Sequence, residues 1–214
     1  MKKIVFGLML SLGFLIPAHA VKEVLFAPDD RPKTRLLEYI AAAKKRIHVA
    51  MYTFTEKDFA DALVLASQRG VHVQVILDLS SVLSPYAKVY LLSPMVEVFA
   101  FVTKQHYSSD PQARTFAPLM HNKFAVIDDV VWTGSFNWTQ SANSRNQENV
   151  VVIKDAQAVK KYEERFQIIR EKCSKVEAVL QSMHVRNKKS ITTKRVQKAR
   201  RLLKRYHKNT CKSA

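Results

Sequence analysis

Two groups of polar residues between residues 120 and 153 have the types and spacing needed for chemistry at phosphorus. In the first group, His121 and Lys123 stand two residues apart at the start of the apolar run KFAVI. On a strand, side chains two residues apart project to the same face. An imidazole and an ammonium group are therefore expected side by side.

The second group follows the next apolar run and contains Gly134, Ser135 and Asn137. Glycine permits a sharp turn, while serine and asparagine supply a hydroxyl and an amide. Glu148 begins a third run and is placed to accept a hydrogen bond from a neighbouring imidazole. The two groups combine a nucleophile or base, fixed positive charge, neutral donors and a carboxylate, which suits attack on a phosphodiester.

The joint spacing of these residues resembles a known motif. His121-x-Lys123-x4-Asp128, followed by Gly134-Ser135-x-Asn137, is similar to the HKD motif of the phospholipase D superfamily. The continuation FNWT and the stretch SANSRNQEN resemble the small, secreted bacterial nuclease branch. The resemblance covers roughly residues 23–172. It implies a catalytic group made of His121, Lys123, Asp128, Ser135, Asn137 and Glu148.

The resemblance also implies individual roles. Lys123 and Asn137 would bind the phosphoryl oxygens, and Glu148 would orient the imidazole of His121, with no cofactor and no metal. One spacing departs from the family pattern, because five residues rather than the usual six separate Asp128 from Gly134. The role of Asp128 is therefore open, and Asp129 is the alternative. A metal site at these two acids is disfavoured, since neighbouring side chains on a strand point to opposite faces.

The number of motifs bears on the oligomeric state. In the family that the motif resembles, two HKD motifs form one active site, in which one histidine attacks phosphorus and the other protonates the leaving oxygen. This chain has one such motif and no internal repeat. The resemblance therefore implies a homodimer whose two-fold axis brings both copies of His121 to one phosphate through a phosphohistidine intermediate.

Strand and helix patterns alternate ahead of the motif. Strands are expected at residues 24–26, 47–54, 71–77, 96–102, 123–127, 130–133 and 149–154, with helices capped by Thr34 and Thr55. From Asp155 an apolar stripe at helical spacing runs to Met183 and predicts one long helix. The expected fold class is α/β, with a mixed, largely parallel β-sheet flanked by helices and a basic helical C-terminal tail.

Charge and hydropathy divide the chain of 214 residues into three parts. Residues 1–20 contain Lys2, Lys3, an apolar run and an A-x-A pattern ending at Ala20, which predicts a signal peptide. Residues 21–177, with 21 basic and 18 acidic residues, form the expected phospholipase D-like phosphodiesterase domain. Residues 178–214 carry twelve basic and no acidic residues. We call this segment the basic tail, and it predicts a polyanionic partner.

The basic tail favours a second helix, with Val196, Ala199, Leu203 and Tyr206 along one side. Two cysteines follow the leader, Cys173 and Cys211; they pair in the exported protein or remain separate thiols.

The sequence therefore predicts a periplasmic or secreted, metal-independent endonuclease acting on DNA or RNA. The first alternative is a phospholipase D acting on phosphatidylcholine-type lipids, with anionic phospholipid as the partner of the tail. The second alternative is a non-catalytic nucleic-acid-binding protein.

Overall fold

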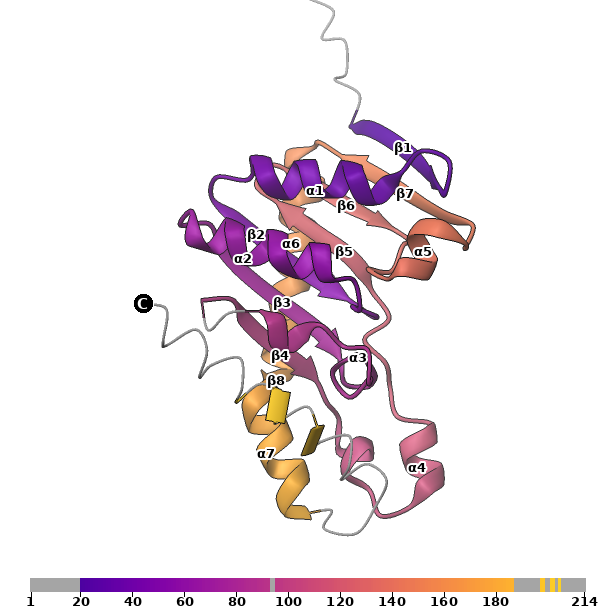
Figure 1. The fold of residues 1–214 in the computed structure, drawn as a ribbon, viewed down its shortest axis with the longest axis vertical. Helices are drawn as coiled ribbons and strands as arrows, with labels where there is room; N and C mark the ends of the chain where they lie inside the picture. Colours follow the sequence, from indigo (N-terminus) through magenta and orange to yellow (C-terminus); the bar gives the residue numbers. More distant parts are fainter. Residues whose placement is uncertain (1–19, 93–94, 187–196, 199–200, 203, 205–214) are drawn as a thin grey trace, which may run out of the picture.

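A computed structural model describes residues 20–92, 95–186, 197–198, 201–202 and 204. An eight-stranded sheet in the order β1-β7-β6-β5-β2-β3-β4-β8 forms the centre of the molecule (Figure 1). The strands are β1 (Val21–Ala27), β2 (Arg46–Met51), β3 (His72–Asp78), β4 (Glu97–Phe101), β5 (Lys123–Ile127), β6 (Val130–Gly134), β7 (Glu148–Ile153) and β8 (Cys173–Lys175).

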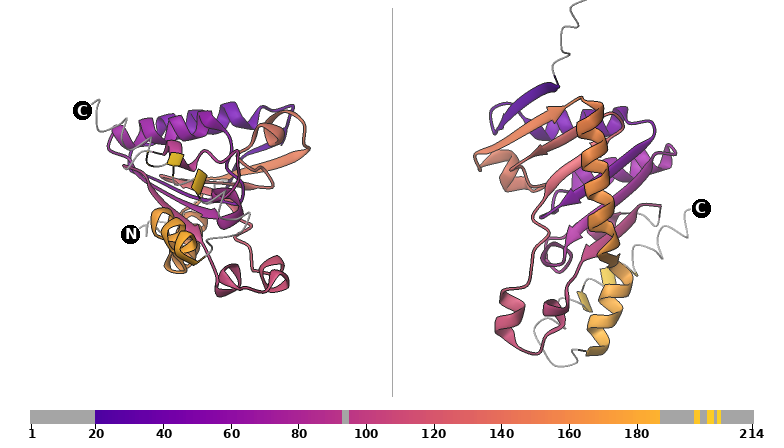
Figure 2. Two further views of the ribbon diagram at one scale, coloured as in Figure 1. Left: turned by 60° about the horizontal axis from the view of Figure 1, so that its bottom comes forward. Right: turned by 180° about the vertical axis from the view of Figure 1, so that it is seen from behind.

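Helices cover both faces of this sheet. Helices α1 and α2 lie on one face, and the long helix α6 crosses the other face, as the view from behind shows (Figure 2). The helices are α1 (Pro32–Ala42), α2 (Lys57–Gln68), α3 (Leu79–Val82), α4 (Pro111–Thr115), α5 (Gln140–Ser144), α6 (Ala156–Glu171) and α7 (Val176–Arg186), with 3-10 turns η1 (Val89–Leu91) and η2 (Lys104–Tyr107). The expected α/β class with a mixed sheet is confirmed.

The sheet is less parallel than the sequence predicted. Among the described strands, β2, β3 and β4 pair in parallel, while the other five pairings are antiparallel. A parallel pairing needs a long crossover, which α2 provides between β2 and β3. The two-residue turn at Asp128 and Asp129 instead makes β5 and β6 a hairpin. The HKD-like segment therefore lies in the antiparallel half of the sheet.

Two apolar layers hold the helices against the sheet. On the α1 and α2 side, Leu36, Ile40 and Leu63 pack with Trp132 and Trp138, all of them buried. On the α6 side, Val159, Phe166 and Ile169 pack against Phe124, Val126 and Val131. Asp155 caps the N-terminus of α6, because its carboxylate accepts a hydrogen bond from the Ala158 N–H at 2.7 Å. The first caps differ from expectation, because Arg31 precedes α1 and Glu56 precedes α2.

The expected long helix is interrupted. Helix α6 ends at Glu171, and Cys173–Lys175 form β8, which pairs antiparallel with β4. The apolar spacing predicted a continuous helix, but an added edge strand satisfies the outer backbone groups of β4. Helix α7 then packs Val179, Leu180 and Met183 into the main core.

The predicted domain boundary lies inside a helix that packs on the core. The division between residues 177 and 178 falls inside α7, and the buried side chain of Met183 belongs to the main core. Residues 1–19, which belong to the predicted signal peptide, lie outside the described residues. So do the tail residues Val196, Ala199, Leu203, Tyr206 and Cys211. Within the described part, no helix is both long and apolar enough to span a membrane.

Candidate active site

The first group of site residues lies where β5 begins. The Lys123 ammonium is 3.2 Å from Nδ1 of His121 and donates to the His121 carbonyl at 2.9 Å. The imidazole and the ammonium group are therefore side by side, as the two-residue spacing predicted. Burial lowers the pKa of Lys123, and the nearby negative charge of Glu148 opposes that shift.

The second group lies where β6 ends and β7 begins. The hydroxyl of Ser135 donates to Oε2 of Glu148 at 2.5 Å and accepts from the Asn149 N–H at 3.0 Å. Glu148 also accepts from Nδ2 of Asn146 at 3.0 Å. The sequence suggested a bond from Glu148 to an imidazole, but the described contacts of its carboxylate are with Ser135 and Asn146. Those two residues lie near the two ends of the segment that joins β6 to β7 through α5.

Gly134 has a structural reason to be glycine. Its φ is +153°, and a Cβ at this position would lie 2.1 Å from the carbonyl oxygen of Asn149. That same carbonyl accepts the Ser135 N–H at 3.0 Å. The close approach of the backbones therefore sets the position of Ser135.

Asn137 is fixed by the segment after β2. Its Oδ1 accepts from the Thr53 N–H at 3.2 Å, and the Trp138 N–H donates to the Thr53 carbonyl at 3.1 Å. With Oδ1 engaged, the Nδ2 amide is the end of Asn137 that can donate to a phosphoryl oxygen.

The first group and Ser135 share one open pocket of about 590 Å³. It is lined by His121, Asn122, Lys123, Phe124, Thr133, Gly134, Ser135 and Tyr162. The pocket offers a nucleophile, fixed positive charge and neutral donors, which is the chemistry that a phosphodiester requires. Tyr162 of α6 was not singled out from the sequence, where it belonged to an apolar stripe.

Asp128 lies apart from this pocket, which corrects its placement in the catalytic group. It follows β5 at the end opposite His121, roughly 20 Å away along an extended chain. Its carboxylate accepts the backbone N–H groups of Lys44, Lys45 and Arg46 at 2.8, 2.9 and 2.9 Å. Burial alone would raise the pKa of Asp128, but these three donors together hold the pKa below its usual value.

Asp129 does not take over a catalytic role either, since it forms an exposed ion pair with Lys154 at 3.1 Å. Among the described residues, no three His, Cys, Asp or Glu side chains are grouped so that they could bind one metal ion.

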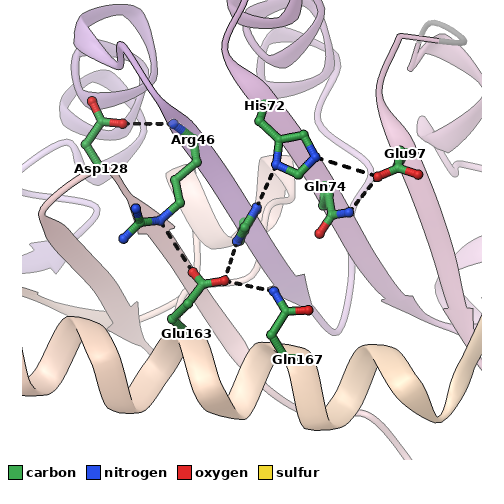
Figure 3. A network of polar contacts seen from close by, with 8 residues as sticks. Arg46, His72, Gln74, Glu97, Asp128, Glu163 and Gln167 are labelled. Atoms are coloured by element: carbon green, nitrogen blue, oxygen red, sulfur yellow. Dashed lines mark hydrogen bonds and ion pairs between the residues drawn. The ribbon is translucent and has the colours of Figure 1, made fainter.

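A second polar cluster lies near the other end of the parallel strands, under α6 (Figure 3). Buried His48 is 2.7 Å from Glu163 through Nδ1 and 3.2 Å from Nδ1 of His72 through Nε2. Gln167 and Arg46 also contact Glu163, at 2.9 and 3.5 Å. Burial lowers the pKa of His48, partly offset by the charge of Glu163. The cluster joins α6 to β2 and β3 and takes no part in the pocket.

Comparisons with known proteins identify the family of this chain. The family model of the cardiolipin synthase, PLD-like domain matches residues 36–170. The mitochondrial cardiolipin hydrolase of Xenopus laevis is 33% identical over 166 residues, covering 73% of this chain and 73% of that protein. A phospholipase D of Rickettsia prowazekii is 33% identical over 138 residues, covering 64% of this chain and 62% of that protein.

Among solved structures, Nuc from Salmonella typhimurium, a phospholipase D family member, aligns with a TM-score of 0.60 at 26% identity. The alignment covers 72% of this chain and 95% of Nuc. The chain therefore belongs to the phospholipase D superfamily, as the HKD-like spacing indicated. Phosphodiester hydrolysis is the activity class of this family.

Proposed function

We propose that the protein is an exported, metal-independent endonuclease that hydrolyses phosphodiester bonds of DNA or RNA. The observation that carries the chemistry is the contact between His121 and Lys123 in a pocket that also holds Ser135. An ammonium group at this point stabilises the charge of a phosphoryl transition state and takes the part that a metal ion has elsewhere.

The active species is a homodimer in this proposal. Each chain contributes one His121, and the reaction needs two. The edge strand β1 supports such an interface, because Val24 and Phe26 are 51% and 56% exposed. Phe26 pairs with Asn149, whose carbonyl accepts the Ser135 N–H, so this apolar edge borders the site. A second chain covering it would bury apolar surface next to the reacting groups.

The reaction then has two balanced steps. The neutral imidazole of one His121 attacks phosphorus, and the P–O bond to the leaving group breaks as the P–N bond forms. The imidazolium of the second His121 gives its proton to the leaving oxygen. Water then attacks the phosphohistidine and loses a proton to the second His121, while the P–N bond breaks and frees the first. Lys123 and the Asn137 amide bind the phosphoryl oxygens.

Nucleic acid is favoured as substrate by charge. The basic tail carries twelve positive charges, whereas residues 21–177 carry a net charge of +3. A tether of this kind raises the local concentration of a polyanion and makes binding strongly dependent on salt. The leader at residues 1–20 supports export to the periplasm or beyond.

Hydrolysis assays test this proposal directly. Plasmid DNA, RNA and phosphatidylcholine vesicles are each incubated with the full chain in excess EDTA, with the His121→Asn variant as control. We expect cleavage of nucleic acid by the wild type and at least a hundredfold loss in the variant. Loss of activity in EDTA that is restored by magnesium would contradict the metal-independent chemistry. A fully active monomer in analytical ultracentrifugation would contradict the dimeric site.

Phospholipid is the second candidate substrate, and one specific observation favours it. Phe116 and Leu119 are 82% and 52% exposed in the segment that leads directly into His121. This segment follows α4, which projects from the body of the molecule (Figure 1). Exposed apolar side chains beside a site are suited to contact with a bilayer. The relatives named cardiolipin hydrolase and phospholipase D agree with this alternative.

The two candidates differ in what Phe116→Ser does. A lipase loses vesicle binding and lipid hydrolysis, whereas a nuclease whose apolar segment plays no part in catalysis keeps its rate on plasmid DNA. Tight DNA binding with no hydrolysis of any of the three substrates would identify a non-catalytic binding protein instead.

A further inference from the structure

Tyr52, the first residue after β2, contacts the side chains of both His121 and Lys123, the first group of site residues. Its ring centroid lies 4.3 Å from that of His121, with an angle of 50° between the rings. The Lys123 ammonium lies 5.1 Å from the centroid of the same ring. One aromatic side chain therefore contacts both the proposed nucleophile and the proposed phosphate-binding cation.

The backbone of the same segment fixes this contact. The Tyr52 N–H donates to the carbonyl of Asn122 at 2.8 Å, and Asn122 lies between His121 and Lys123. The next N–H, that of Thr53, donates to Asn137. Residues 52 and 53 thus connect the two halves of the site, which are separated by a hairpin in the sequence.

The ring has an electrostatic consequence as well as a steric one. The face of an aromatic ring attracts cations, so the Tyr52 ring stabilises the Lys123 ammonium in its place beside His121.

We propose that Tyr52 is a positioning residue for the reaction, whose ring holds the His121 imidazole and the Lys123 ammonium in place. The inference rests on the proposed phosphodiesterase chemistry. The ring makes these contacts, and none of the described hydrogen bonds involves the Tyr52 hydroxyl at this site. Phenylalanine should therefore replace tyrosine, while an aliphatic side chain should not.

Steady-state kinetics on bis(p-nitrophenyl) phosphate with the full chain test this inference. Tyr52→Phe should retain most of the wild-type kcat. Tyr52→Leu should lower kcat about tenfold to a hundredfold, the range expected when reacting groups are misplaced or an aromatic–cation contact is lost. KM should change less than kcat, because the phosphoryl ligands themselves remain.

A matched control separates this role from an unspecific effect of replacing a tyrosine by leucine. Tyr86→Leu is the matched control, because Tyr86 is 72% exposed and does not line the pocket. Its kcat and KM should equal those of the wild type.

Several results would overturn the inference. An unchanged kcat in Tyr52→Leu would do so. A Tyr52→Phe variant as impaired as Tyr52→Leu would also do so, because it would assign the role to the hydroxyl. If Tyr52→Leu fails to fold, Tyr52→Trp and Tyr52→Met replace it; equal kcat in these two would refute a role for the ring. Absence of wild-type hydrolysis would instead refute the proposed function itself.

Discussion

Replacing Asp128 should lower the stability of the fold without lowering the rate of phosphodiester hydrolysis. The motif spacing assigns Asp128 to the catalytic group, yet its carboxylate accepts three backbone N–H groups of the segment that joins α1 to β2. It also has a φ of 49°, in the left-handed region that aspartate and asparagine tolerate better than alanine. The structure therefore makes Asp128 a residue that fixes the start of β2.

The size of the effect follows from these contacts. A net contribution of about 1 kcal/mol for each of three partly exposed hydrogen bonds gives about 3 kcal/mol for Asp128→Ala. The left-handed backbone adds about 1 kcal/mol. Asp128→Asn keeps one acceptor oxygen and the tolerated φ, so it should cost about 1–2 kcal/mol. For a chain of this length, the alanine variant should lower Tm by about 10 °C.

Differential scanning calorimetry and hydrolysis of a small phosphodiester at 15–20 °C below the variant's Tm check this prediction. Asp129→Ala is the matched control, because the neighbouring carboxylate makes a single exposed ion pair, worth at most about 1 kcal/mol. Since the pKa of Asp128 is held low, its stabilising effect is present at neutral pH and is lost as the pH falls through that lowered value. An Asp128→Asn variant with wild-type Tm and strongly reduced kcat would refute the assignment.

Three further predictions concern individual side chains. Gly134→Ala should destabilise the fold by about 2–3 kcal/mol in urea titrations, because its Cβ would meet the Asn149 carbonyl; an unchanged midpoint would contradict the close approach. The wild-type protein should lose stability as the pH falls below about 6.5, because burial lowers the pKa of His48 and the unfolded chain then binds a proton more readily. His48→Gln should make this loss smaller, and His106→Gln, at a second histidine with a lowered pKa, serves for comparison. The charge of Glu148 raises the pKa of Lys123 against the effect of burial, so Glu148→Gln should lower that pKa further. The alkaline limb of the pH–activity profile should then move to lower pH, and an unmoved limb would show that this charge does not matter.

The local pattern of the sequence was sufficient to predict much of this protein. The alternating and apolar runs predicted β5 at its observed bounds and β2, β3, β6 and β7 within a few residues. The side-by-side placement of His121 and Lys123 agrees with their spacing of two, although β5 itself begins at Lys123. The family followed from the spacing of the whole motif, and the comparisons confirmed it.

Tertiary structure decided the features that depend on partners distant in sequence. Cys173 continues the apolar helical spacing of the sequence, but in the structure it begins β8, which pairs with the edge of β4 and follows the end of α6. Asp128 belongs to the sequence motif, but its carboxylate accepts hydrogen bonds from backbone N–H groups more than 80 residues away in the sequence and lies outside the pocket. The sequence predicted Tyr52 only as a residue of a buried strand, whereas the structure shows its ring in contact with the ring of His121. Spacing along the chain specifies which side chains share a face, whereas the groups that a face meets are set only when strands from different parts of the chain pair.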